Sequence, residues 1–179
     1  MHTAVRTLVL LGLSIGIGTQ AQAQAQTSAS VDFCVNVQNA LAILAPNGPI
    51  SLNHDGTTGI KSFAPQTFSA VCNDGDGATV TFGTIAGFVH NTLPLVTRDV
   101  KLDLAIASSD TEAGWAVDVV SDQSDLTNLV PDLSSQVQAS SSGPGNVELQ
   151  LTVSMDSGSV TTLVPGTYCT TIYATITAN

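Results

Sequence analysis

Strict alternation of apolar and polar residues is the feature that most constrains the fold of this chain. Over Val147–Met155 every second residue is apolar and the intervening residues are polar. The same period of two runs over Val100–Ile106, 66–72 and 78–84. Because successive side chains of a β-strand point to opposite faces, the pattern predicts strands with one buried and one solvated face. A slip of one residue in the pairing of strand 147–155 would expose its whole apolar face to solvent, so the register of this strand is firmly set.

The alternation also predicts which residues form the core. Each large apolar side chain buried in this way contributes roughly 1.5–3 kcal/mol. We expect these inward faces: Phe68, Ala70 and Cys72; Val80 and Phe82; Val100, Leu102, Leu104 and Ile106; Trp115, Val117 and Val119; and Val147, Leu149, Leu151, Val153 and Met155.

Turn-forming residues separate these segments. They gather at Pro46–Pro49, Asp55-Gly56, Asn73–Gly77 and 140–145. After residue 30 no stretch carries an apolar stripe with the 3.6-residue period of a helix. Short two-sided strands joined by such turns predict an all-β protein, an immunoglobulin-like two-sheet β-sandwich.

The first residues have the pattern of a secretory signal peptide. Arg6 supplies a positive start, Leu8–Gly18 is a short apolar run, and Ala21–Ala23 offers the small residues at which signal peptidase cuts. The run is shorter than the ~20 residues that span a bilayer. We therefore expect a cleaved leader over 1–23, with cleavage after residue 25 as the alternative, and one sandwich domain over 24–179. The protein would be exported to the periplasm, the cell surface or the medium.

The charge of the chain excludes several partners. All 14 acidic residues follow the leader, where only Lys61, Arg98 and Lys101 are basic, so the mature net charge is −11. Such a surface repels phosphate backbones and anionic lipid, and nucleic acid is not an expected partner. The sequence after the leader has no second apolar segment long enough to predict membrane insertion.

Motifs of catalysis and metal binding are missing from the sequence. It contains no Gly-x-Ser-x-Gly elbow, HExxH helix or P-loop, so we expect no enzyme, no catalytic residue and no cofactor. Asn73–Gly77 resembles the start of a calcium loop, but its twelfth position would be Gly83 instead of Glu, which favours a solvated turn. His54 and His90 stand alone beside turns, and we expect both on the surface.

The two ends of the mature chain alternate as well. Near the C-terminus, Pro165-Gly166 makes a turn and the inward positions from Tyr168 to Ala178 are mainly apolar. We expect this segment to be one strand integral to a sheet. Just after the leader, SVDFCVNV places Val31, Phe33, Val35 and Val37 on one side of a strand.

These ends resemble the pilin-like domains of the spore coat protein U and archaic chaperone–usher type. The resemblance lies in Gly166-Thr167-Tyr168, which opens the last strand fourteen residues from the end, and in the alternating N-terminal strand. Ala178 departs from it, because that position is usually aromatic in chaperone–usher pilins. The resemblance implies a sandwich that lacks one strand and receives it from a neighbouring subunit.

In that arrangement residues 25–37 would be the donated strand. An incomplete sandwich exposes an apolar groove edged by unpaired backbone, and an alternating strand from another chain fills it. The partners would be further copies of the chain, or a pilus chaperone and usher. The strand-exchange residues would be Val31, Phe33, Val35, Val37, Gly166 and Tyr168.

Two other arrangements stay open. The N-terminal strand would equally fold back and complete its own domain, or the domain would be an ordinary closed sandwich. The product would then be a closed, monomeric secreted module for binding or adhesion, with a ligand site on its loops.

Three cysteines leave an odd thiol in an oxidising compartment. Cys34 and Cys169 share the polar sides of their strands, so they would meet if the first and last strands are neighbours, and in a strand-exchanged filament that bond would link subunits. The family resemblance implies instead that Cys34 pairs with Cys72, a bond that would contribute roughly 4 kcal/mol.

Mass spectrometry of the exported protein under non-reducing conditions tests both pairings. We expect one linked peptide, joining Cys34 either to Cys72 or to Cys169. Detection of three free thiols would contradict both.

Overall fold

The computed structural model describes residues 31–179, and the structural statements below concern these residues. Its chain divides into Met1–Asn36, of which 31–36 are described, and a compact unit over Val37–Asn179. The expected leader over 1–23, and residues 24–30, lie outside the described part. Residues 31–40 form no strand or helix.

Within 31–179 the secondary structure is β-strand, with two short 3-10 turns, η1 (Thr111–Ala113) and η2 (Val160–Thr162), and no α-helix. The fold class expected from alternation, all-β, is therefore confirmed. The strands are β1 (Leu41–Leu44), β2 (Ile60–Ser62), β3 (Gln66–Cys72), β4 (Ala78–Thr84), β5 (Phe88–His90), β6 (Thr97–Ser109), β7 (Ala116–Val119), β8 (Ser121–Gln123), β9 (Ser135–Ser140), β10 (Gly145–Asp156), β11 (Tyr168–Cys169) and β12 (Tyr173–Ala178).

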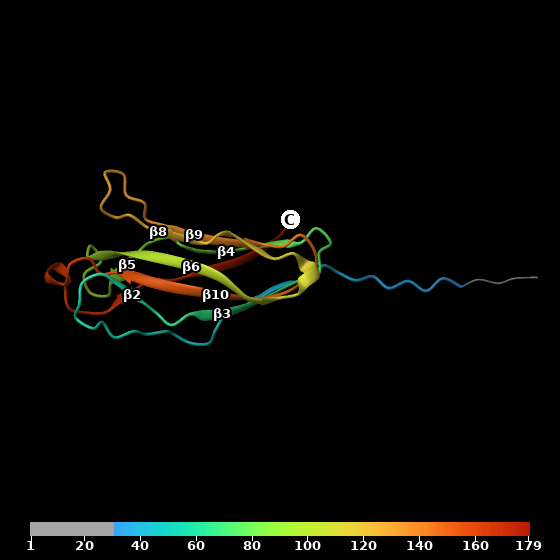
Figure 1. Cartoon of the computed structure of the whole chain (residues 1–179), viewed down its shortest axis with the longest axis horizontal. Helices are drawn as coiled ribbons and strands as arrows, with labels where there is room; N and C mark the ends of the chain where they lie inside the picture. Colours follow the sequence, from blue (N-terminus) through green and yellow to red (C-terminus); the bar gives the residue numbers. More distant parts are fainter. Residues whose placement is uncertain (1–30) are drawn as a thin grey trace, which may run out of the picture. The chain divides into compact units, whose positions relative to one another are not determined.

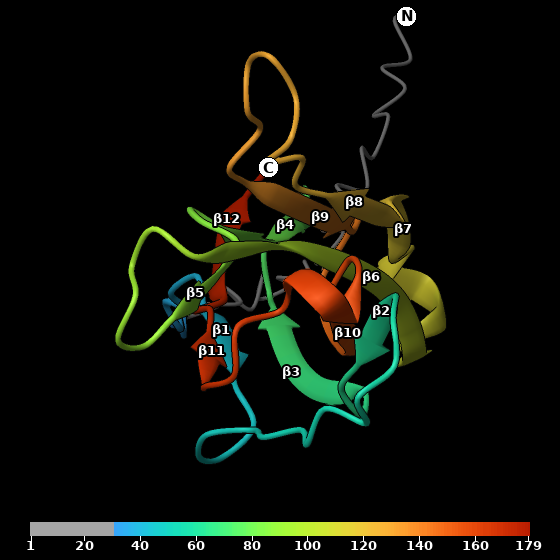
Figure 2. The same ribbon diagram turned by 90° about the vertical axis from the view of Figure 1, so that its left-hand side faces the viewer.

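The strands of the compact unit build two antiparallel sheets packed face to face. The first sheet has the order β1-β3-β10-β6-β5-β11, with β2 beside β10 and β8 beside β6; the second has the order β12-β4-β9-β7. In Figure 1, β3 and β10 lie in one layer and β4 and β9 in the other. Figure 2 shows β12, β4 and β9 next to one another in the second sheet.

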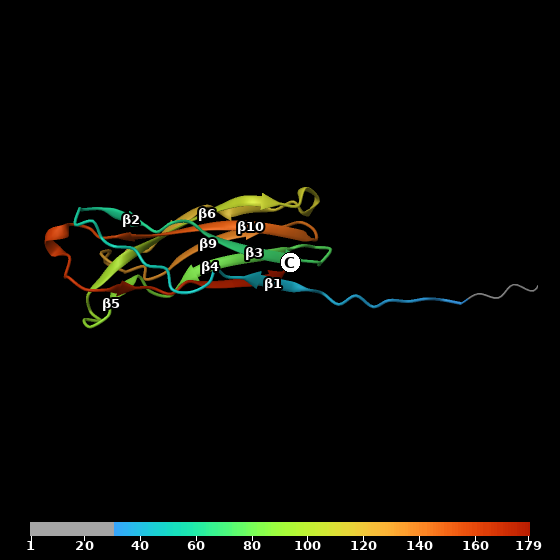
Figure 3. The same ribbon diagram turned by 90° about the horizontal axis from the view of Figure 1, so that it is seen from below.

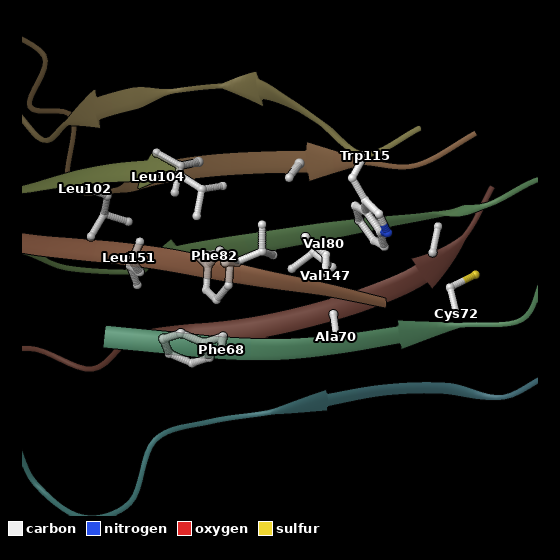
Figure 4. Packing of buried hydrophobic residues seen from close by; sticks show 14 of the residues in the cluster. Phe68, Ala70, Cys72, Val80, Phe82, Leu102, Leu104, Trp115, Val147 and Leu151 are labelled. Atoms are coloured by element: carbon white, nitrogen blue, oxygen red, sulfur yellow. The ribbon is translucent and has the colours of Figure 1, made fainter. Parts of the chain in front are cut away.

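The core forms where the two inward faces meet. Phe82, Leu102 and Leu149 are completely buried. Phe68 of the first sheet meets Phe82 of the second edge to face, with ring centroids 4.8 Å apart (Figure 4). Aromatic pairs prefer this geometry, which adds to the hydrophobic contribution of the rings. The predicted inward sets of β3, β4 and β10 are all buried or half-buried, so their register is confirmed.

Two expectations about strands are wrong. Val119 was expected to face inward with Val117, but the pairing of β7 with β9 shifts register between them and leaves Val119 exposed. An extra residue at a bulge reverses the face of the residues that follow it. The strand expected from Tyr168 to Ala178 is in fact two: β11 pairs with β5 in the first sheet, and β12 pairs with β4 in the second. Residues 170–172 cross between the sheets.

A pair of matched leucine substitutions tests this core. Leu149→Ala should lower the free energy of unfolding by about 2–5 kcal/mol, because the side chain is fully buried and its removal leaves a cavity. Leu129→Ala removes the same atoms from a side chain that is 97% exposed, and it should change the free energy of unfolding by less than about 0.5 kcal/mol. Urea unfolding followed by tryptophan fluorescence measures both, and equal effects would contradict the assigned burial.

Candidate functional site

The strongest candidate site is a seam between the edges of the two sheets, formed by β1 and β12. Within the described residues, β1 pairs only with β3 and β12 pairs only with β4. Cα atoms of the two strands approach within 8 Å across the seam, yet no ladder joins them. Figure 3 shows β1 and the dark-red β12 along the same side of the sandwich. Each strand therefore keeps one side without a strand partner in the part of the chain that is described.

The side chains along the seam are apolar but only half-buried. Elsewhere in the sandwich, core residues such as Val80 and Leu102 are completely covered. At the seam the core is completed by residues that pack on it and stay partly accessible, namely Leu41, Ile43, Ile172, Ala174 and Ile176. Covering this accessible apolar surface with another apolar group would lower the free energy of the protein.

A cavity opens into the core at one end of the seam. Its volume is about 300 Å3, and it lies between the end of β1 and the segment that crosses to β12. Phe68 and Leu151 of the core and Ile172 of the crossing segment contribute to its wall. The cavity is large enough for a bulky side chain and mostly apolar where it meets the core.

At the other end of the seam, one loop fixes both strands. Asn73 accepts the N–H of Ala40 through its side-chain oxygen and donates from its amide to the carbonyl of Gln38 at 2.9 Å. Asn179 donates its backbone N–H to Gly77 and its side-chain amide to Ser141, the latter at 2.8 Å. The 73–77 loop, considered above as a calcium site or solvated turn, thus connects the two sheets and positions the first and last strands.

Gly166, a predicted strand-exchange residue, lies away from the seam against His90. A Cβ at position 166 would stand 2.0 Å from Nε2 of His90, and φ of Gly166 is +154°. His90 is 3% exposed, so the expectation of a surface histidine is wrong. Its Nδ1 accepts the N–H groups of Thr92 and Leu93, and its Nε2 lies 3.1 Å from the carbonyl of Pro165. Backbone groups therefore lie within hydrogen-bonding distance of both ring nitrogens, which allows the imidazole to be buried.

Tyr168 belongs to the same cluster. Its ring stands edge-on to His90 with centroids 5.0 Å apart, and its hydroxyl donates to the carbonyl of Val164 at 2.9 Å. The structure brings Gly166, Tyr168 and His90 together and keeps them out of the seam. Their contacts give the Gly-x-Tyr sequence a structural role in joining β11 to β5.

The four predicted anchors of the donated strand are uncovered. Val31, Phe33, Val35 and Val37 are 74%, 93%, 89% and 75% exposed, and the segment forms no strand. Their side chains leave a row of apolar surface accessible to solvent.

All three cysteines carry free thiols in the structure. Cys72 is buried and faces inward as predicted, and its sulfur accepts the N–H of Asp74 at 3.3 Å. Cys34 and Cys169 are exposed. Both proposed disulfide pairings stay predictions.

The charged side chains with shifted pKa values in the described part belong to two ion pairs. Among residues 31–179 no group of three or more His, Cys, Asp and Glu is placed to hold a metal ion. The Lys61 ammonium, 2.9 Å from Asp55, holds the pKa of that exposed carboxyl well below its usual range. Partial burial raises the pKa of Asp103, but hydrogen bonds from Lys101 and Ser121 outweigh it, and the net shift is downward.

Comparisons with known proteins find no relative. No family model, curated protein or solved structure matches the chain. None of the helices in the described part is long and apolar enough to span a membrane.

The contact between Gly166 and His90 yields a stability test. Gly166→Ala should destabilise the protein by about 1–3 kcal/mol, because the new methyl group must displace a buried ring. Gly75→Ala is the matched control, since a Cβ there meets nothing within 4 Å. Thermal unfolding monitored by circular dichroism measures the two variants, and an unchanged melting temperature for Gly166→Ala would refute the contact.

Proposed function

We propose that this protein is an exported structural subunit of the cell surface, pilin-like or coat-like, with an immunoglobulin-like sandwich, that assembles by β-strand complementation. The observation that carries the proposal is the seam between β1 and β12, where half-buried apolar residues lie beside strand edges without a partner in the described residues. The occupant would be the segment 25–37 of another copy.

The edge formed by β12 lacks the usual protection against pairing. Soluble proteins commonly blunt an edge strand with lysine, proline or a bulge. No charged residue occurs from Leu163 to Asn179, and β12 pairs with β4 without a register shift. An unprotected edge beside an apolar seam is suited to accepting an additional strand.

The segment Val31–Val37 has matching periodicity. Its apolar side chains recur every second residue, as do Ile172, Ala174 and Ile176 along the seam. Two strands of equal period face each other with their apolar side chains in step, about 6.6 Å apart along each strand. Covering four exposed anchors would contribute roughly 1.5–3 kcal/mol each before the cost of ordering the segment.

Insertion also requires the seam to open. Neighbouring strands lie about 4.8 Å apart, so a strand paired on both sides needs roughly 10 Å between β1 and β12. Their Cα atoms approach within 8 Å, so the two edges must move apart to admit it. A chaperone that holds the seam open until the donated strand arrives would fit this requirement.

Removal and resupply of the segment tests the proposal. A variant lacking residues 24–37 but retaining the leader should be exported and fail to assemble, and a synthetic peptide of residues 25–37 should bind it and raise its melting temperature by several degrees, on the order of a 1–3 kcal/mol stabilisation. Light scattering after size exclusion and thermal unfolding provide the two readouts.

The matched control is the same peptide with Phe33→Asp and Val35→Asp, which keeps its length but places charges on the apolar side. It should neither bind nor stabilise. If the full-length protein is a monomer at all concentrations and the deletion merely lowers its stability without peptide rescue, the chain is a closed binding module instead of a polymerising subunit.

A further inference from the structure

The outer face formed by β12, β4 and β9 of the second sheet carries no charged side chain, and the charge of this sheet lies at its far edge, where Asp118 of β7 is exposed. Its outward positions on β12, β4 and β9 alternate with the buried ones and are occupied mainly by hydroxyl and amide side chains. By contrast, the outer face of the first sheet bears Lys101, Asp103 and Glu148. A neutral face is unexpected in a chain with 14 acidic and four basic residues. Its main side chains are Thr175, Thr177, Thr79, Thr81, Gln136 and Gln138.

Tyr173 is the aromatic residue of this face. It is 52% exposed, and its cross-strand neighbour on β4 is Gly83, so no side chain covers it from that position. Tyr173 lines two hollows of about 180 and about 240 Å3, and the exposed Ile85 lines both as well. Among residues 31–179, only Phe33 is a more exposed aromatic residue.

The polar groups beside Tyr173 are available for hydrogen bonds. Within the described residues the side chains of Thr81, Thr175 and Gln136 make no hydrogen bond to the protein, and all three line the larger hollow. They stand on neighbouring strands about 4.8 Å apart, so the backbone ladder fixes their spacing. Asp122 at the rim accepts the N–H of Gln136 at 2.7 Å, which fixes the end of β9.

We propose that this face is a binding site for a neutral polysaccharide. A pyranose ring presents C–H groups to the face of an aromatic ring and hydroxyl groups at its rim, which matches a tyrosine flanked on the side of the larger hollow by hydroxyl and amide groups. The net charge of the protein disfavours acidic polymers. The uncharged surface of β12, β4 and β9 would accept several consecutive sugar units, with Tyr173 as the platform.

This site is independent of strand exchange. Tyr173 and Thr175 point outward from β12, whereas Ala174 and Ile176 line the seam. The outer face stays accessible whether the seam is closed, occupied by a donated strand or held by a chaperone. Binding should therefore occur in a monomer and in an assembled subunit alike.

Affinity electrophoresis of the full-length exported protein tests the site, with soluble neutral β-1,4-glucan, β-1,3-glucan and α-mannan as probes. At least one probe should retard the wild type, and Tyr173→Ala should weaken that binding about tenfold. Tyr173→Phe keeps the platform and should bind nearly as well as the wild type. Gln136→Ala should weaken binding, while Gln150→Ala, an exposed glutamine on the outer face of the first sheet, should leave it unchanged.

Melting temperatures of all variants establish that the fold is retained. If none of the three polysaccharide probes retards the wild type, the proposal is overturned. Equal retardation of the wild type and Tyr173→Ala also overturns it. A third outcome is that the wild type forms a concentration-dependent dimer without any glycan and that Tyr173→Ala abolishes it. In that case the face is a contact between copies of the chain and the polysaccharide site is refuted.

Discussion

The structure depends on the packing of two inward strand faces against each other. Phe82 of one sheet and Leu149 of the other are fully buried, and the alternation of polar and apolar residues gives each strand only one register that buries them. Because the sheets consist of strands with a polar outer side, the fold has no second core. The outer faces are consequently free to differ: the first bears Lys101, Asp103 and Glu148, whereas the β12, β4 and β9 part of the second has no charged side chain.

Two-layer packing explains the seam. A sandwich buries its core well at the centre, where strands flank each other on both sides, and less well where each layer ends. β1 and β12 are such ends on the same side of the molecule, so Ile43 and Ile176 are only half-covered. The proposed assembly uses this incompleteness, because the alternating pattern that makes a strand of the sandwich also occurs in the segment 31–37.

Alternation was sufficient to predict the fold class and most of the core, because burial of one face is a local property of each strand. It could not predict that Val119 lies after a bulge, since the shift is set by pairing with β9. His90 was assigned to the surface because isolated histidines near turns usually lie there, whereas backbone N–H groups from its own turn satisfy it here. The strand Leu41–Leu44 has no alternation to reveal it, so half of the seam was not foreseen.

The burial of Cys72 has a consequence for the order of events in biogenesis. The residue is 2% exposed at the end of β3, so its thiol is shielded from an oxidoreductase in the folded unit. A bond to Cys72 must therefore form while the polypeptide is still loose, before the layers close. The exposed thiol of Cys169, by comparison, stays accessible to solvent after folding is complete.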